Sequence, residues 1–158
     1  MNGTTDGRPR AEGVRWDLSR IVADADAART LLDETLAASD AFAAAYRGRV
    51  ATLDADAFAA SLAELSRIEN ALSRVGSYSG LRRSVDVNDE QARDLEAVVE
   101  QGYVRAANTL RFFELEWIAL DEQPAQVLIG APQLSRDAHY LTAARRYRPH
   151  RLTETEEA

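Results

Sequence analysis

Side chains that could bind a metal or act as nucleophiles are scarce in this sequence. It contains no cysteine, and its only histidines are His139 and His150. A helical zinc motif places two histidines four residues apart on one face, whereas these two are eleven positions apart with Pro149 between them. We therefore expect no metal site, no bound cofactor and no catalytic residue in this chain.

The stretch Gly76-Ser77-Tyr78-Ser79-Gly80 has the small residues of a phosphate-binding loop. Such a loop needs a preceding strand and a lysine, and this sequence contains no lysine. We interpret the stretch as a place where a helix bends or where another helix comes close.

Three pairs of carboxylates could indicate acid–base catalysis. Each pair lies at a predicted helix start, where a carboxylate can accept hydrogen bonds from free backbone N–H groups. We therefore interpret them as caps: Asp24 with Asp26, Asp54 with Asp56, and Glu154 with Glu156.

Apolar residues recur three and four positions apart through most of the chain, which is the spacing of one helical face. No stretch alternates apolar and polar residues as a strand would. The sequence predicts an all-α fold, an elongated antiparallel bundle of three long helices plus one or two short ones. The expected helices cover 24–46, a second from Asp54 or Asp56 to about residue 80, a third capped by Asn88 and ending near Leu120, and shorter pieces at 124–129 and 135–148.

An aromatic group lies on the third predicted helix. Core packing is the first interpretation of these side chains, and a contact surface for another domain is the second. The group comprises Tyr103, Phe112, Phe113 and Trp117.

Composition excludes several partners. The formal net charge of −7 argues against nucleic acid, which requires a basic face. No apolar run approaches the ~20 residues that span a bilayer, so we expect no membrane partner. Residues 1–13 lack the apolar stretch of a secretory signal, and we expect a cytoplasmic protein.

The end of the chain resembles the start of a helix. Thr153 is a suitable N-cap, and Glu156 completes a capping box three residues later. We therefore expect a truncated chain with a disordered tail at 1–13, a helical domain at 14–150, and at 151–158 the start of a helix leading to an absent catalytic domain.

Several landmarks, taken in order, resemble a known family. They are Trp16-Asp17-Leu18-Ser19, Tyr46-Arg47-Gly48, residues 77–82 followed by 84–89, residues 112–116, His139-Tyr140-Leu141 and residues 148–157. In order and spacing they resemble the N-terminal region of oligoendopeptidase F-like zinc metallopeptidases, relatives of thimet oligopeptidase. The resemblance covers nearly all of the chain after residue 13.

The resemblance implies an all-helical enzyme that hydrolyses short peptides with a zinc ion held by a His-Glu-x-x-His motif. This sequence lacks that motif, so the resemblance implies a substrate-restricting helical domain that is inactive alone. Its implied partners are the catalytic domain, in cis or in trans, and the oligopeptide substrate of the whole enzyme. Candidate residues facing the substrate channel are Tyr78, Arg82 and Tyr140.

Two other functions stay open at this stage. The chain could be a free-standing helical interaction module, for example a dimer formed through its aromatic stripe, or a small independent hydrolase. A domain that belongs against a catalytic lobe should expose an apolar face.

Overall fold

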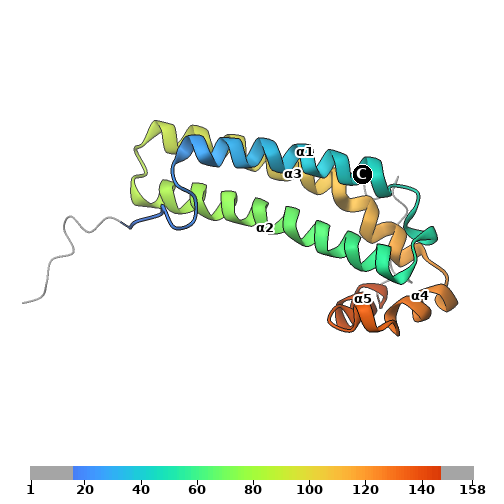
Figure 1. Cartoon of the computed structure of the whole chain (residues 1–158). Coiled ribbons are helices and arrows are strands. Elements are labelled where there is room, and N and C mark those ends of the chain that lie inside the picture. The colour runs from blue at the N-terminus through green and yellow to red at the C-terminus, as the bar shows by residue number, and fades with distance from the viewer. Residues whose placement is uncertain (1–15, 147–158) are drawn as a thin grey trace, which may run out of the picture.

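The computed structural model describes residues 16–146, and its helices form an elongated antiparallel bundle (Figure 1). The long helices are α1 (Ala25–Tyr46), α2 (Ala55–Val85) and α3 (Glu90–Ala119). The short elements are the 3-10 turns η1 (Val50–Thr52) and η2 (Pro132–Leu134) and the helices α4 (Glu122–Ile129) and α5 (Ala138–Arg145). These residues contain no strand, so the predicted all-α fold is confirmed. The predictions for 1–13 and 151–158, and for Pro149 and His150, lie outside the described residues.

The first two long helices begin at the predicted caps. The Asp24 carboxylate accepts a hydrogen bond from the backbone N–H of Ala27 at 2.8 Å, and Asp54 accepts one from Ala57 at the same distance. Each carboxylate satisfies a donor that has no partner within its helix. The acidic residues at these starts therefore have structural roles.

The predicted cap of the third helix is wrong by one residue. Asp89 is the N-cap of α3, and its carboxylate accepts a hydrogen bond from Ala92 N–H at 3.1 Å. Asn88 belongs to the preceding turn, where its backbone N–H donates to the Asp86 carboxylate at 2.9 Å. Both side chains can cap a helix, and the turn geometry selects the aspartate.

Helix α3 contacts both α1 and α2. Tyr103 of the predicted aromatic group is 54% exposed, so core packing, the first interpretation of that group, is wrong for this residue. At the end of the bundle where α2 begins and α3 ends, Phe58 lies between Phe113 and Trp117, with ring centroids 5.6 and 5.1 Å away. Of the predicted aromatic group, Phe112, Phe113 and Trp117 are core residues.

The turn between α1 and α2 is held by a glutamate of α3. Gly48 has a φ of 75°, a left-handed conformation that glycine adopts without a steric penalty. The Glu116 carboxylate accepts hydrogen bonds from the backbone N–H groups of Gly48 at 2.7 Å and Val50 at 3.3 Å. Two landmarks of the sequence, at 46–48 and 112–116, thus meet in the fold.

The chain folds back at the end of α3, and α4 and α5 lie beside one end of the bundle (Figure 1). Helix α5 begins at Ala138, three residues later than predicted. The segment before it forms tight turns, in which Ser135 N–H donates to Pro132 O at 3.3 Å and Asp137 N–H donates to Leu134 O at 2.9 Å. Helix α4 begins two residues before Pro124, which fits in its first turn because a proline there sacrifices no helical hydrogen bond.

Within 16–146, no helix combines the length and the apolar character required to cross a bilayer.

Candidate functional site: a groove between three helices

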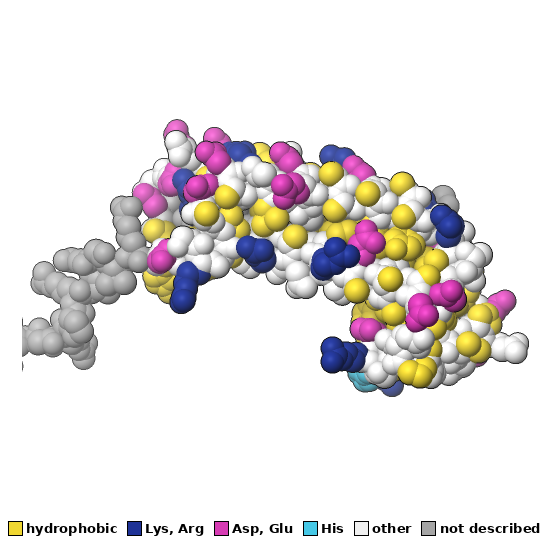
Figure 2. Space-filling model, in the orientation of Figure 1, with side chains coloured by type: hydrophobic (Ala, Val, Ile, Leu, Met, Phe, Trp, Pro, Cys, Tyr) yellow, Lys and Arg dark blue, Asp and Glu magenta, His cyan; other side chains and the backbone are white. Residues whose placement is uncertain are grey.

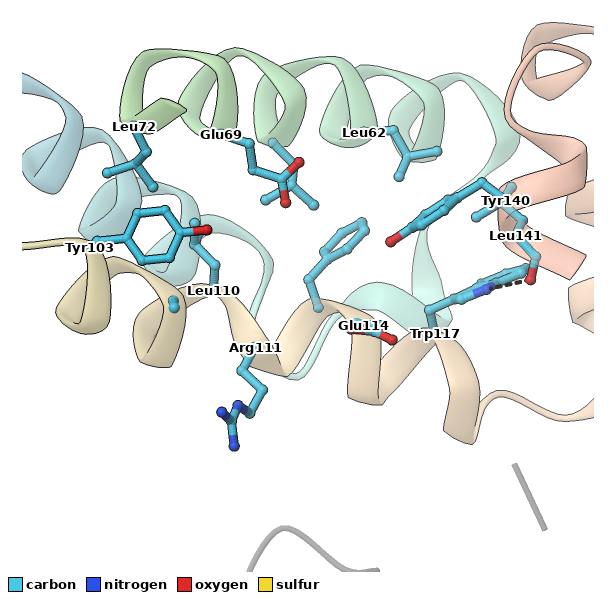
Figure 3. Close-up of a pocket in the computed structure, with 13 residues that line it drawn as sticks. Leu62, Glu69, Leu72, Tyr103, Leu110, Arg111, Glu114, Trp117, Tyr140 and Leu141 are labelled. Atoms are coloured by element: carbon cyan, nitrogen blue, oxygen red, sulfur yellow. Dashed lines mark hydrogen bonds between the residues drawn. The ribbon is translucent and has the colours of Figure 1, made fainter. Parts of the chain in front are cut away.

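A groove runs between α2 and α3 and is closed at one end by α5 (Figure 3). Its cavity volume is about 240 Å³. In the space-filling view, the surface is hollowed where α5 projects beside α2 (Figure 2). The lining residues are Leu62, Leu65, Glu69 and Leu72 from α2, Tyr103, Ala107, Leu110, Arg111, Phe113, Glu114 and Trp117 from α3, and Tyr140 and Leu141 from α5.

The spacing of these residues explains why they share one surface. On each long helix the lining positions recur every three or four residues, which keeps them on one face. Helix α1 packs against both α2 and α3 and forms the third side of the bundle. The groove therefore follows the line where α2 and α3 meet, on the side away from α1. Among the described residues, no long helix covers this apolar side.

The end wall of the groove is fixed by one buried hydrogen bond. The indole Nε1–H of Trp117 donates to the carbonyl oxygen of Leu141 at 3.1 Å, as Figure 3 shows. Trp117 is buried in the core, so this bond ties α5 to the bundle. The adjacent Tyr140 is 54% exposed at the mouth of the groove. Of the three predicted channel residues, Tyr140 alone lies in this groove.

Two carboxylates, Glu69 on α2 and Glu114 on α3, line the otherwise apolar walls (Figure 3). Partial burial raises the pKa of the Glu69 carboxyl above its ordinary value of 4.5, and the nearby negative charge of Glu114 raises this pKa further. Arg111 extends away from the two carboxylates in Figure 3. The groove therefore combines apolar contact area with negative charge.

Tyr78 and Arg82 lie in a different hollow, near the other end of α2. The structure does not bring them together with Tyr140. Tyr78 is buried, and the Arg82 guanidinium lies 3.5 Å from the Asp89 carboxylate. This second hollow has a volume of about 680 Å³, and the segment from Trp16 to Ser19 forms one of its sides. The backbone N–H of Ala92 lowers the pKa of Asp89, and Arg82 contributes to the same shift.

A third hollow is mostly apolar and lies where α4 meets the start of α2. It has a volume of about 490 Å³ and includes Val127, which is 69% exposed. The other lining residues are Ala51, Leu53, Asp54, Ala55, Leu120, Gln123, Pro124, Leu128 and Ala131. Exposed apolar surface is found here, whereas an apolar face that packs against another lobe stays a prediction.

The described residues do not fit a zinc ion. Between residues 16 and 146, no group of three or more His, Cys, Asp or Glu side chains is placed to hold a metal ion. His139 is exposed on α5, and the other histidine, His150, lies outside this range. No catalytic step through a metal can be derived from this part of the chain.

Sequence reasoning did not select Glu69 or Glu114 as site residues, and it placed Tyr103 in an aromatic group with core packing as the first interpretation and a contact surface as the second. A signal for the glutamates was present, because each interrupts an apolar stripe: Glu69 lies between Leu65 and Leu72, and Glu114 lies between Leu110 and Trp117. Both glutamates are nevertheless exposed in the fold, as charged residues usually are, so their spacing alone does not distinguish a groove from an ordinary solvated face.

Comparison with protein-family models gives no match. The sequence is 27% identical over 151 residues to the Group B oligopeptidase PepB of Streptococcus agalactiae serotype III (strain NEM316), covering 92% of this chain and 24% of that protein. A crystal structure from Chlamydophila abortus, provisionally assigned as a peptidase, matches with a TM-score of 0.74 and 20% identity, over 90% of this chain and 24% of that one. The chain thus spans about a quarter of each protein, and the matches fit the N-terminal region of a peptidase, as the sequence landmarks indicated.

Proposed function

We propose that this chain is the N-terminal helical domain of an oligopeptidase and that it restricts the substrates to short peptides. In this proposal the groove between α2, α3 and α5 faces the substrate channel. The cytoplasmic location expected from the sequence is part of the same proposal and remains a prediction.

One observation carries the proposal. The sequence match to the streptococcal oligopeptidase extends over 92% of this chain but only 24% of that protein. A match of this extent supports correspondence of a whole domain rather than a shared motif. The match to the Chlamydophila protein adds a shared fold over 90% of this chain, which agrees with this correspondence.

In this proposal the helical domain shapes the substrate channel, and another part of the protein carries out the hydrolysis. The resemblance to oligoendopeptidase F-like enzymes implies a zinc ion that activates water for attack on the peptide bond. Because residues 16–146 do not fit a zinc ion, we assign the hydrolysis to the part of the relatives that the match does not cover. This chain would contribute apolar and charged surface that orients the peptide.

A second function, a helical module that associates with itself or with another protein, is favoured by the apolar hollow around Val127. In an oligopeptidase the same hollow would pack against the catalytic lobe. Light scattering over a range of concentrations gives the mass of the isolated chain, and this mass distinguishes the two functions. A stable dimer that is disrupted by Val127→Asp would favour the interaction module.

A chimaera tests the proposed function. This chain replaces the matched quarter of the streptococcal oligopeptidase, and cleavage of a short quenched peptide is measured. The control is the streptococcal protein with that quarter deleted. We expect the chimaera to cleave the peptide and the deletion variant to lose most of its activity. If the deletion variant is as active and selective as the intact enzyme, the domain has no such role.

A further inference from the structure

The groove between α2, α3 and α5 is too small for a whole oligopeptide. Ligand pockets for drug-sized molecules measure roughly 300–1,000 Å³, and this one holds about 240 Å³. Its size suits one large side chain with its adjoining backbone. The groove is therefore suited to anchoring one residue of a longer chain.

The walls of the groove indicate an apolar side chain. Leu65 is half-buried, while Leu62, Leu72 and Leu110 are buried yet line the cavity. Ala107 is exposed and leaves the space between the helices open. A side chain placed there would exclude water from a surface that is already largely apolar, which is the main source of affinity at such sites.

The charges in the groove indicate a cation. Glu69 and Glu114 come from opposite walls, and the negative charge of Glu114 disfavours the ionised form of Glu69. Among residues 16–146, Glu69 has no hydrogen-bonding or ion-pair partner. A positively charged group between α2 and α3 would offset the repulsion between the two carboxylates and give Glu69 an ion-pair partner.

Two exposed tyrosines also favour the binding of a cation in the groove. Tyr103 and Tyr140 are each 54% exposed, and Figure 3 shows them towards opposite ends of the groove, with Glu69 between them. The face of an aromatic ring attracts cations, and tyrosine offers both contact area and a hydroxyl group for hydrogen bonding. Exposed tyrosines are typical of surfaces that bind other chains.

We infer that this groove binds a peptide segment carrying a positive charge next to a large apolar side chain. The choice of a peptide rests on the proposed function, whereas the choice of charge and side chain rests on the groove. The cation could be an arginine or lysine side chain or the free amino terminus of the peptide. All of these offer N–H donors to the carboxylates of the groove.

The test measures binding of synthetic peptides to the whole chain by calorimetry, without any catalytic partner. One peptide has a capped amino terminus and an arginine beside leucine and phenylalanine. A second replaces arginine by neutral citrulline, and a third has citrulline with a free amino terminus. We expect the arginine peptide to bind about tenfold more tightly than the capped citrulline peptide, and the third peptide shows whether an amino terminus can replace arginine.

Matched variants locate the binding site. Glu69→Gln and Glu34→Gln each remove one negative charge, but Glu34 lies on α1, outside the groove. We expect Glu69→Gln to weaken binding of the arginine peptide about fivefold to tenfold, and Glu34→Gln to change it less than twofold. Ala107→Trp, which fills the groove from an exposed position, should abolish binding, with circular dichroism verifying the fold.

The inference is overturned if the arginine and capped citrulline peptides bind equally, if both charge variants have the same effect, or if no peptide binds. It is also overturned if a second copy of the chain occupies the groove, so that Ala107→Trp converts a dimer to a monomer. These outcomes leave the chimaera experiment unaffected, because that experiment measures catalysis rather than anchoring by this groove.

Discussion

Arg145 closes the end of helix α3 at Trp117. Its Nη1 donates a hydrogen bond to the carbonyl oxygen of Trp117 at 2.9 Å, and its guanidinium carbon lies 5.4 Å from the centre of the Trp117 ring. Its Nη2 donates to Leu120 O at 2.8 Å and pairs with the Glu122 carboxylate at 3.0 Å. A buried cation thus donates to the last carbonyl groups of α3, one of which, Trp117 O, also accepts from Leu120 N–H at 3.3 Å. It lies at the end where the helix dipole favours positive charge.

Replacing Arg145 should therefore destabilise the fold. Arg145→Met keeps much of the side-chain length but leaves the carbonyl groups of Trp117 and Leu120 without this donor. We predict a loss of about 2–4 kcal/mol in the free energy of unfolding, measured with urea. The control is Arg146→Met, at an exposed position next to it, which should change stability by less than about 0.5 kcal/mol. Equal losses in both variants would contradict the capping role.

The two glutamates of α3 near the groove should respond differently to loss of charge. Glu116 accepts hydrogen bonds from Gly48 and Val50 through different carboxylate oxygens, and glutamine keeps one acceptor oxygen. We predict that Glu116→Gln lowers the free energy of unfolding by about 1 kcal/mol. Glu114→Gln should cause a smaller loss than Glu116→Gln, because it also removes the repulsion with Glu69. The midpoints and slopes of urea unfolding measure the stability of both variants. A larger loss for Glu114→Gln than for Glu116→Gln would refute the role assigned to Glu116.

The stability should depend on pH through Glu69. Its pKa is raised in the folded protein, so the folded state binds this proton more tightly than the unfolded state does. The resulting stabilisation is fully present below the ordinary pKa of 4.5 and is lost as the pH rises through the folded-state value.

Glu69→Gln removes this titration, because glutamine resembles the neutral carboxyl group. We predict that the variant is more stable than the wild type near neutral pH and that the difference disappears below the ordinary glutamate pKa. Urea unfolding of both proteins at a series of pH values measures the difference. A difference that is constant with pH would show that Glu69 has an unshifted pKa.

Two helical glycines should respond in opposite ways to alanine. A Cβ atom added at Gly76 meets nothing within 4 Å, whereas one added at Gly102 would lie 2.8 Å from Cδ1 and 3.0 Å from Cδ2 of the buried Leu32. We predict that Gly76→Ala raises the free energy of unfolding by up to about 1 kcal/mol, from helix propensity.

The steric conflict at Gly102 should outweigh the same gain in propensity, because overpacking a core costs about 1–3 kcal/mol. Thermal unfolding of both variants provides the comparison. If Gly102→Ala stabilises the protein as much as Gly76→Ala does, then α1 and α3 are not in close contact at Leu32.

The helices could be predicted from the sequence because their signals are local. Asp24 and Asp54 precede apolar residues at helical spacing, and both are the observed caps. Asn88 and Asp89 are both good caps, so local propensity could not decide between them. The start of α5 was also missed, because the turns that precede it are set by Pro132 and by packing of Leu134 rather than by a cap.

The groove could not be predicted because it depends on how helices meet. The apolar spacing on α3 did not show which positions would remain uncovered, so core packing was the first interpretation of Tyr103 and a contact surface was the second. Tyr78 and Tyr140 were grouped by resemblance, and they are separated because they belong to opposite ends of the bundle (Figure 1). Contacts between distant parts of the chain determine such a site.

The most direct test of the central claim is the size selectivity of the chimaera with the streptococcal oligopeptidase. The quantity to measure is kcat/KM for a short peptide divided by kcat/KM for the same cleavage sequence within a long unfolded protein. We predict a large ratio for the chimaera and a ratio near unity for the enzyme lacking this domain. A chimaera that cleaves both substrates equally well would contradict a role for this chain in restricting substrates.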